Sequence, residues 1–430
     1  MYDSKEIQDM LSPSSLDEGW IDRKVLNDPR IHALELERIF ARCWLFLGHE
    51  SQLPNAGSFI TTWMGTDNVL VVRRRDSSIG AYINSCPHRG NRVVTAGIGK
   101  ANAFTCNYHC WSFDLSGKLI AVHEEEAFKR DPGYDRSQLG LPPVRVATYK
   151  GLIFGTFDAQ APTLEEYLGP FAYLMDVVLD NDPGGTEFIP GSGAYTVECN
   201  YKDGALNFAG DALHLAPTHA SASRVMIGRD IPPLGGEDAV SYQVNFNGHC
   251  WEFNLDKRGN AATLGSQLVM DYLRELEPQF VERLGPIRAR MVASTGSVNL
   301  WPNFSFAPGL NTFRVWEPKG PDRTVLRHWV LVNRDAPAEV KEEWRKGVMK
   351  TFSAAGAFEA VGDVQSWRGV TASHRGTVTR RHPLYARLGE DTRLENSDLG
   401  FPEELNVYRG QVSDANTRHY LRTWYKWMSA

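Results

Sequence analysis

Two patterns of hydrophobic and polar residues follow one another along the chain. Up to about residue 158, short β-branched and aromatic runs are separated by turn formers, which is typical of an antiparallel β domain. The clearest runs are 59–63, 68–72, 81–84 and 152–157. Beyond residue 158, strand-like runs alternate with stretches whose apolar residues recur at helical spacing. The change predicts an all-β domain over residues 40–158 and an α+β domain formed by residues 1–39 and 159–430.

Several elements of the second domain have recognisable boundaries. Thr163-Leu164-Glu165-Glu166 has the form of a capping box and predicts a helix that runs to Val178. A second helix is predicted from about Ala338 to Lys350, after Asp335 and Pro337. Strands are predicted at 195–199, 241–246, 304–306 and 328–332.

Composition narrows the class of protein. The chain has 430 residues, 42% of them hydrophobic and 23% charged, which is ordinary for a globular protein with two cores. A net charge of −6 argues against nucleic acid or an anionic membrane as the main partner. The first residues do not form a secretory signal, and no stretch reaches the length of a membrane-spanning helix. Six cysteines are too few for a disulfide scaffold, so a cytoplasmic location is expected.

The stretch from Asn200 to His219 combines an apolar helical pattern with side chains that bind metals. Asp211 and His214 are three residues apart, so they share a helix face and can hydrogen-bond. His219 points away from His214 on an ideal helix, but Pro217 is predicted to break the helix and let His219 return. Two imidazoles with a carboxylate behind one of them are part of the facial triad of ferrous oxygenases. The competing interpretation is a pair of surface histidines.

A second metal signature lies in the β domain. Cys86-Pro87-His88-Arg89-Gly90 and Cys106-Asn107-Tyr108-His109-Cys110-Trp111 each supply one cysteine and one histidine in the same order. Structural zinc is the obvious competitor, but its usual pattern is a Cys-Cys pair followed by a His-His pair. A Rieske [2Fe–2S] cluster needs the interleaved pattern, because one iron takes both cysteines and the other takes both histidines. We therefore expect such a cluster on Cys86, His88, Cys106 and His109.

Taken together, these motifs resemble those of the catalytic α subunit of Rieske non-heme iron aromatic-ring-hydroxylating dioxygenases, most closely the naphthalene and biphenyl branch. The resemblance covers nearly the whole chain, since the 335–350 helix and the 352–358 stretch also match. It implies a Rieske β domain, a helix-grip α+β domain with a curved antiparallel sheet, and mononuclear Fe(II) held by His214 and His219. Asp211 is expected to link His214 to a cluster histidine of a neighbouring subunit, and Asn207 to lie near the iron. The residues at substrate-cavity positions are all apolar: Phe208, Leu213, Leu215, Phe352 and Phe358.

Two positions depart from the family pattern. Cys110 stands where a glycine is usual after the last cluster ligand, which implies a different loop or a tolerated small side chain. The acidic third iron ligand is also displaced. Asp363 lies one residue later than expected but four before Trp367. We expect Asp363 to be the ligand in preference to Glu359, which is otherwise a solvated or salt-bridged helix residue.

The resemblance implies cis-dihydroxylation of an aromatic ring with dioxygen and electrons from NAD(P)H. Gly191-Ser192-Gly193 opens no helix, so we find no dinucleotide fingerprint, and a ferredoxin and a reductase are expected partners. A homotrimer, commonly capped by small β subunits (α3β3), is implied. One alternative is monohydroxylation of an aromatic acid such as a salicylate, for which a buried arginine or Asn299 or Asn303 in the cavity would argue. Others are a pure electron carrier and a zinc-stabilised binding protein. The substrate and regiochemistry are left open.

Overall fold

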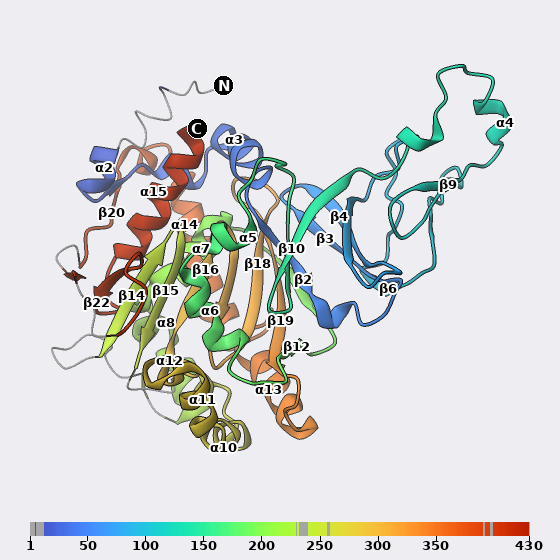
Figure 1. Ribbon diagram of the computed structural model, residues 1–430. Helices are drawn as coiled ribbons and strands as arrows, with labels where there is room; N and C mark the ends of the chain where they lie inside the picture. Colours follow the sequence, from blue (N-terminus) through green and yellow to red (C-terminus); the bar gives the residue numbers. More distant parts are fainter. Residues whose placement is uncertain are drawn as a thin grey trace. The chain divides into compact units, whose positions relative to one another are not determined.

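The chain folds as two compact units (Figure 1). The structure is a computed structural model that describes residue 5 and residues 13–228, 230–231, 240–255, 259–389, 392–395 and 399–429. The smaller unit is Phe40–Leu164, and the larger one combines Met1–Ile39 with Glu165–Ala430. None of the described helices has both the length and the apolar run that a membrane crossing requires.

The smaller unit is an antiparallel β domain, as the short β-branched runs predicted. Its main sheet has the order β2–β11–β10–β5–β4–β3–β6, and a second sheet has the order β7–β8–β9. The unit extends to Leu164, and the Ala161 carbonyl near its end accepts a hydrogen bond from Arg145 of β10. The strands are β2 (Leu45–His49), β3 (Ser58–Met64), β4 (Asp67–Arg73), β5 (Ile79–Ile83), β6 (Ile98–Lys100), β7 (Phe104–Thr105), β8 (Ser112–Phe113), β9 (Leu119–Ala121), β10 (Pro143–Tyr149) and β11 (Leu152–Thr156).

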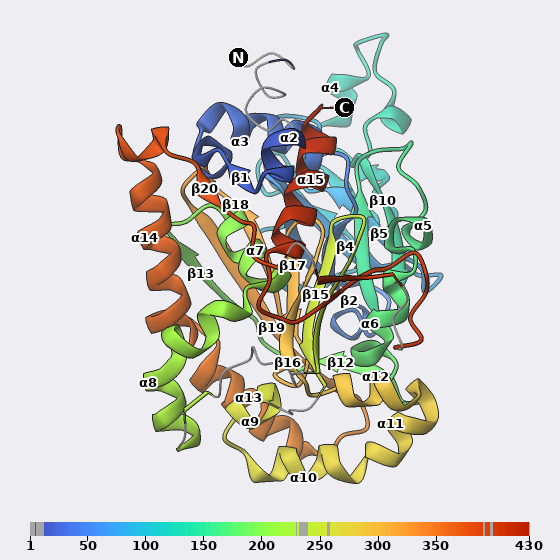
Figure 2. The same ribbon diagram turned by 90° about the vertical axis from the view of Figure 1, so that its left-hand side faces the viewer.

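The larger unit is an α+β domain built on one long antiparallel sheet. The strand order is β12–β19–β18–β17–β16–β15–β14–β22–β21, and β13 also pairs with β19. Figure 2 shows helices around this curved sheet. Its strands are β12 (Thr186–Phe188), β13 (Gly193–Val197), β14 (Ser241–Phe246), β15 (His249–Asn254), β16 (Thr295–Leu300), β17 (Phe304–Ala307), β18 (Thr312–Pro318), β19 (Thr324–Asn333), β21 (Arg393–Leu394) and β22 (Asn406–Arg409), with a separate β1 (Trp20–Ile21)–β20 (Leu384–Tyr385) pair.

The helices of the larger unit position its candidate site. Helix α7 packs against β15–β18, and α15 packs against α7 and β14 with Tyr420 and Trp424 fully buried. The described α-helices of the chain are α2 (Pro13–Asp17), α3 (Pro29–Glu35), α4 (Glu125–Phe128), α5 (Leu164–Leu168), α6 (Phe171–Leu179), α7 (Tyr201–Gly210), α8 (Leu215–Ile227), α9 (Gly259–Thr263), α10 (Gln267–Glu275), α11 (Glu277–Leu284), α12 (Pro286–Met291), α13 (Ala338–Thr351), α14 (Val364–His374) and α15 (Ala415–Ser429).

Two helix predictions need correction. The helix expected from residue 164 to 178 is divided into α5 and α6, because Gly169 has a φ of +49° and Pro170 cannot donate a backbone hydrogen bond. Pro217 does not break the helix before His219. It lies in the first turn of α8, where a missing N–H costs nothing, and the chain breaks instead at Asp211, whose φ of −115° and ψ of 59° are not helical.

Candidate metal centres and substrate cavity

The two Cys/His loops of the smaller unit have the same backbone geometry. The Gly90 N–H donates to the Cys86 carbonyl at 2.8 Å, and the Cys110 N–H donates to the Cys106 carbonyl at 2.9 Å. Each cysteine N–H in turn donates at 2.8 Å to the carbonyl of the residue five positions later, Asn91 or Trp111. One loop follows β5 and the other connects β7 to β8, so the sheets hold two equivalent turns.

These loops bring two thiols and two imidazoles together. Cys86 and Cys106 are buried at 3% and 1% exposure. The rings of His88 and His109 lie 4.5 Å apart between centroids, and His88 stacks on Trp111. The Nδ1 atom of His88 is buried and has no hydrogen-bond partner in the described part of the chain. Two buried sulfurs beside two imidazoles, one with an orphaned nitrogen, fit the ligand set of a Rieske cluster.

The shared loop geometry explains the unusual cysteine. Gly90 has a φ of +75° and its counterpart Cys110 has a φ of +57°, so each loop ends on a left-handed residue. Glycine adopts this conformation without a steric penalty, whereas a residue with a Cβ is strained there. Cys110 is therefore a strained residue in an otherwise ordinary loop, with its side chain exposed.

Replacing Cys110 with glycine is expected to stabilise the smaller unit by roughly 0.5–1 kcal/mol, because it removes the Cβ from a left-handed position. Thermal melting of the whole chain, followed by the visible absorption expected of the cluster, measures the change. Cys110→Ala is the matched control, since alanine keeps the Cβ and should leave the melting temperature unchanged. Equal stabilisation by both variants would attribute the effect to the thiol and not to the backbone.

In the larger unit, α7 leads into the second candidate metal site. The helix starts with a capping box, in which the Asn200 side chain accepts from the Lys202 N–H and the Asp203 carboxylate accepts from the Asn200 N–H. It ends before Asp211, a short 3₁₀ turn (Ala212–His214) follows, and α8 then begins. This kink turns the His214 side chain towards His219, and the two ring centroids lie 5.2 Å apart.

Asp363 completes the group. Its Oδ1 atom lies 3.1 Å from His219 Nε2 and 3.3 Å from His214 Nε2. One ligand atom from each of the three residues lies within 4.8 Å of the others. Asp363 Oδ1 is buried, and apart from these ring nitrogens it has no hydrogen-bond partner among the described residues. An orphaned carboxylate oxygen that faces two imidazole nitrogens fits a divalent cation of the facial-triad type.

The displaced spacing of Asp363 has a structural cause. Residues Glu359–Asp363 form a π-helical turn directly before α14. A π-turn holds one residue more than the corresponding α-turn, so it absorbs the extra residue and still aims Asp363 at the histidines. Glu359 points elsewhere and forms a buried ion pair with Arg314 at 2.7 Å.

Asp363 and His214 shift each other's pKa values. Burial opposes an ionised Asp363, but the hydrogen-bonded imidazoles of His214 and His219 lower its pKa to about 2. Burial likewise opposes a charged His214, yet the carboxylates of Asp211 and Asp363 raise its pKa well above the ordinary value. Asp363 is therefore ionised at neutral pH, which is the form that binds a cation.

Asp211 and Asn207 flank His214. The Asp211 carboxylate Oδ2 lies 3.5 Å from His214 Nδ1 and its side chain is 47% exposed. The same Nδ1 also contacts the backbone carbonyl of Asp211. The Asn207 amide nitrogen lies 3.4 Å from each ring nitrogen of His214. Both residues line a cavity on the side of the group that faces Trp367 and Tyr385.

A second cavity is lined by all three ligands. Among the residues expected to bind substrate, Phe208, Leu215 and Phe352 line it. Phe358 lies behind the wall, with its ring 5.2 Å from His219 and stacked on Phe352. Leu213 does not fit the expectation, because it is 59% exposed in the 3₁₀ turn and points away. Asn299 and Asn303 are buried but hydrogen-bond to Ser305 and Trp316.

Sequence reasoning missed much of this cavity wall. The remaining lining residues come from α9, β15, β16, β17 and the turn after β17, and no motif marks them: Glu252, Asn260, Gly296, Ser297, Ala307 and Leu310. Glu252 is a carboxylic acid in a fully buried strand. The available signal was a carboxylate between two large apolar residues, Trp251 and Phe253.

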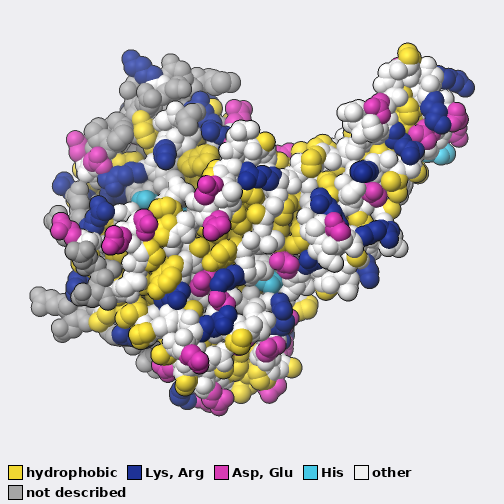
Figure 3. All heavy atoms as spheres, viewed as in Figure 1, with side chains coloured by type: hydrophobic (Ala, Val, Ile, Leu, Met, Phe, Trp, Pro, Cys, Tyr) yellow, Lys and Arg dark blue, Asp and Glu magenta, His cyan; other side chains and the backbone are white. Residues whose placement is uncertain are grey.

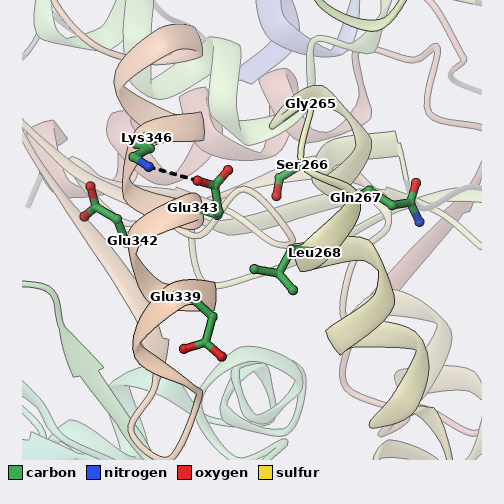
Figure 4. Close-up of a pocket in the computed structure, with 8 residues that line it drawn as sticks. All are labelled: Gly265, Ser266, Gln267, Leu268, Glu339, Glu342, Glu343 and Lys346. Atoms are coloured by element: carbon green, nitrogen blue, oxygen red, sulfur yellow. Dashed lines mark hydrogen bonds and ion pairs between the residues drawn. The ribbon is translucent and has the colours of Figure 1, made fainter.

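Another hollow lies at the surface between α13 and the start of α10 (Figure 4). Two of its three glutamates belong to ordinary helical ion pairs: Glu343 pairs with Lys346 at 3.0 Å and Glu342 with Arg345 at 2.7 Å. On the face drawn in Figure 3, basic and acidic side chains are interspersed. The candidate active site is the cavity lined by Phe208, His214 and Phe352.

Comparison with known proteins assigns both units. Residues 43–149 match the family model of the Rieske [2Fe-2S] domain. Residues 189–395 match the model of the ring hydroxylating alpha subunit (catalytic domain). The two matched ranges contain the two groups of candidate metal ligands.

Relatives match over nearly the whole chain. The biphenyl dioxygenase subunit alpha of Metapseudomonas furukawaii is 37% identical, covering 94% of this chain and 91% of the relative. The benzene 1,2-dioxygenase subunit alpha of Pseudomonas putida is 36% identical with the same coverage. A solved structure of naphthalene 1,2-dioxygenase with indole bound in the active site superposes with a TM-score of 0.88 at 29% identity, covering 96% of this chain and 92% of that one.

Proposed function

The chain belongs to the family of catalytic α subunits of Rieske non-heme iron ring-hydroxylating dioxygenases, and from this premise we propose how its residues dihydroxylate an aromatic ring to a cis-dihydrodiol. The observation that carries the proposal is the convergence of His214 Nε2, His219 Nε2 and Asp363 Oδ1 beside a largely apolar cavity. The family uses a [2Fe–2S] cluster and a mononuclear iron.

Each metal group has its own set of residues. Cys86, His88, Cys106 and His109 would hold the cluster, and His214, His219 and Asp363 would hold the mononuclear iron. When bound, the cluster supplies single electrons and the iron supplies the centre at which dioxygen is activated. An iron held by only these three protein ligands would keep coordination positions free for dioxygen.

The cavity residues orient the arene and exclude water. Phe208, Leu215 and Phe352 give it an apolar wall that an aromatic ring can pack against. Asn207 holds its amide beside the His214 ring and limits how that ring can rotate. Asp211 holds a negative charge beside His214 Nδ1 on the exposed side, where we propose that electrons arrive from a neighbouring subunit.

Hydroxylation of an aromatic acid is not favoured. None of the described residues that line the cavity is a lysine or an arginine. Arg314 is buried and lies 4.6 Å from the Phe208 ring, but its guanidinium is paired with Glu359. An anionic substrate would therefore find no unpaired lysine or arginine among the described residues of the cavity wall.

Family α subunits oligomerise and receive electrons through a ferredoxin and a reductase. We propose that this chain forms a homotrimer, capped by a small β subunit, and accepts electrons that originate from NAD(P)H. The exposed carboxylate of Asp211 supports the trimer, since a bridge to a neighbour's cluster needs an accessible group.

The test is oxidation of arenes under ¹⁸O₂ by the chain with a surrogate ferredoxin and reductase. A functional oxygenase should contain about three irons per chain and yield cis-dihydrodiols that carry two labelled oxygen atoms. Two irons and no product would indicate an electron carrier. One labelled oxygen per product would indicate a monohydroxylase.

A further inference from the structure

A hydrogen-bonded polar pair forms part of the cavity wall. Glu252 of β15 and Ser297 of β16 are directly opposite in the antiparallel register, so their side chains stand on the same face of the sheet. Both residues line the cavity with His214, His219 and Asp363. The Ser297 hydroxyl donates to Glu252 Oε1 at 3.0 Å. The pair therefore faces the space in which the arene would bind.

The second carboxyl oxygen of Glu252 is unsatisfied. Glu252 is 2% exposed, and its Oε2 atom is buried without a hydrogen-bond partner among the described residues. Burial first, and then the nearby charge of Asp211, raise the pKa of this carboxyl to about 8, although the charge of His214, the Ser297 hydroxyl and the Ala212 N–H act in the opposite direction. Buried polar atoms without partners are rare in folded proteins, and such an atom at a cavity wall is one that a bound molecule can satisfy.

The chemistry of the missing partner follows from the carboxyl group. An ionised carboxylate only accepts hydrogen bonds, whereas the neutral acid also donates one. A hydroxyl group can both donate and accept, so it satisfies Oε2 in either protonation state. A plain hydrocarbon leaves Oε2 unsatisfied, and an aromatic carboxylate would bury a full negative charge at a wall whose described residues include no lysine or arginine.

We propose that Glu252 determines specificity by hydrogen-bonding a hydroxyl group on the aromatic substrate, so that hydroxylated arenes are preferred over the parent hydrocarbons. This inference rests on the proposed function and names its substrate class. Ser297 holds the carboxyl in place through Oε1, and the wall of Phe208, Leu215, Leu310 and Phe352 packs on the rest of the ring system.

The test compares matched substrates on the reconstituted oxygenase. Biphenyl and its three monohydroxy derivatives are supplied with a surrogate ferredoxin and reductase. The kcat/KM of at least one hydroxylated isomer should exceed that of biphenyl by roughly 10- to 100-fold. In Glu252→Leu the ratio of kcat/KM for the hydroxylated isomer to kcat/KM for biphenyl should fall to about one, mainly through a raised KM for the hydroxylated isomer. Glu252→Gln keeps a hydrogen-bonding amide and should retain most of the preference.

The outcomes separate the two proposals. If no arene is oxidised by the wild-type chain, the dioxygenase function itself fails. If biphenyl is oxidised but no hydroxylated isomer is preferred, only the role of Glu252 is overturned, and this result needs no variant. Retention of the full preference by a folded Glu252→Leu chain with its normal iron content would overturn that role as well.

Discussion

Replacing Asp363 with alanine is expected to remove the mononuclear iron and to lower product formation by at least about 100-fold, while the [2Fe–2S] cluster remains. The buried carboxylate is the one anionic member of the group, and its Oδ1 atom contacts both histidine nitrogens. Without it, two neutral imidazoles would have to hold a ferrous ion alone. Iron analysis should fall from about three to about two per chain, with the visible spectrum of the cluster unchanged.

Glu359→Gln is the matched control, because Glu359 is the other carboxylate of the same π-turn. It pairs with the buried Arg314 and does not reach the histidines. The variant should keep its iron but lose roughly 3 kcal/mol or more of unfolding free energy, since a buried guanidinium loses its counter-charge. Loss of iron in Glu359→Gln, together with normal iron in Asp363→Ala, would reverse the proposed ligand assignment.

The π-turn also shows where prediction from sequence reaches its limit. The ligand types and their order along the chain can be read from the motifs, because His214, Asp211 and the two Cys/His pairs lie at short, characteristic spacings. The backbone path that brings Asp363 to them cannot be read in this way. A change from i→i+4 to i→i+5 hydrogen bonding inserts one residue, which rotates the side chains that follow by roughly 100° about the helix axis, and it leaves no mark in residue composition.

Pro217 and Leu213 illustrate the same limit within one segment. Proline was expected to break the helix, but at the start of α8 it is compatible with helical geometry. The true break at Asp211 turns Leu213 outward and leaves Leu215 to face the cavity. Fold class was predictable, because it depends on many residues of strand and helix periodicity. The cavity wall was not, because it depends on which strands meet, and Glu252 and Ser297 are opposed only through the sheet register.

Asp211→Asn is expected to keep most of its mononuclear iron and to lose at least about 100-fold in turnover. The His214 ring has two acceptors beside Nδ1: the Asp211 backbone carbonyl and the carboxylate at 3.5 Å. The substitution leaves the backbone carbonyl in place, so the ring keeps its orientation and Nε2 still faces Asp363. What is lost is the negative charge on the exposed side of His214.

Because only the charge of Asp211 is removed, Asp211→Asn is expected to impair electron delivery and not metal binding. In a rapid-mixing experiment with reduced cluster, substrate and dioxygen, oxidation of the cluster should slow in proportion to turnover, with iron content near the wild-type value. Asp414→Asn is a suitable control, since Asp414 lines the same cavity as Asp211 but is not one of the residues that contact His214. Wild-type rates of cluster oxidation in Asp211→Asn would show that the carboxylate is no part of the electron path, and the case for a bridge between subunits would fall with it.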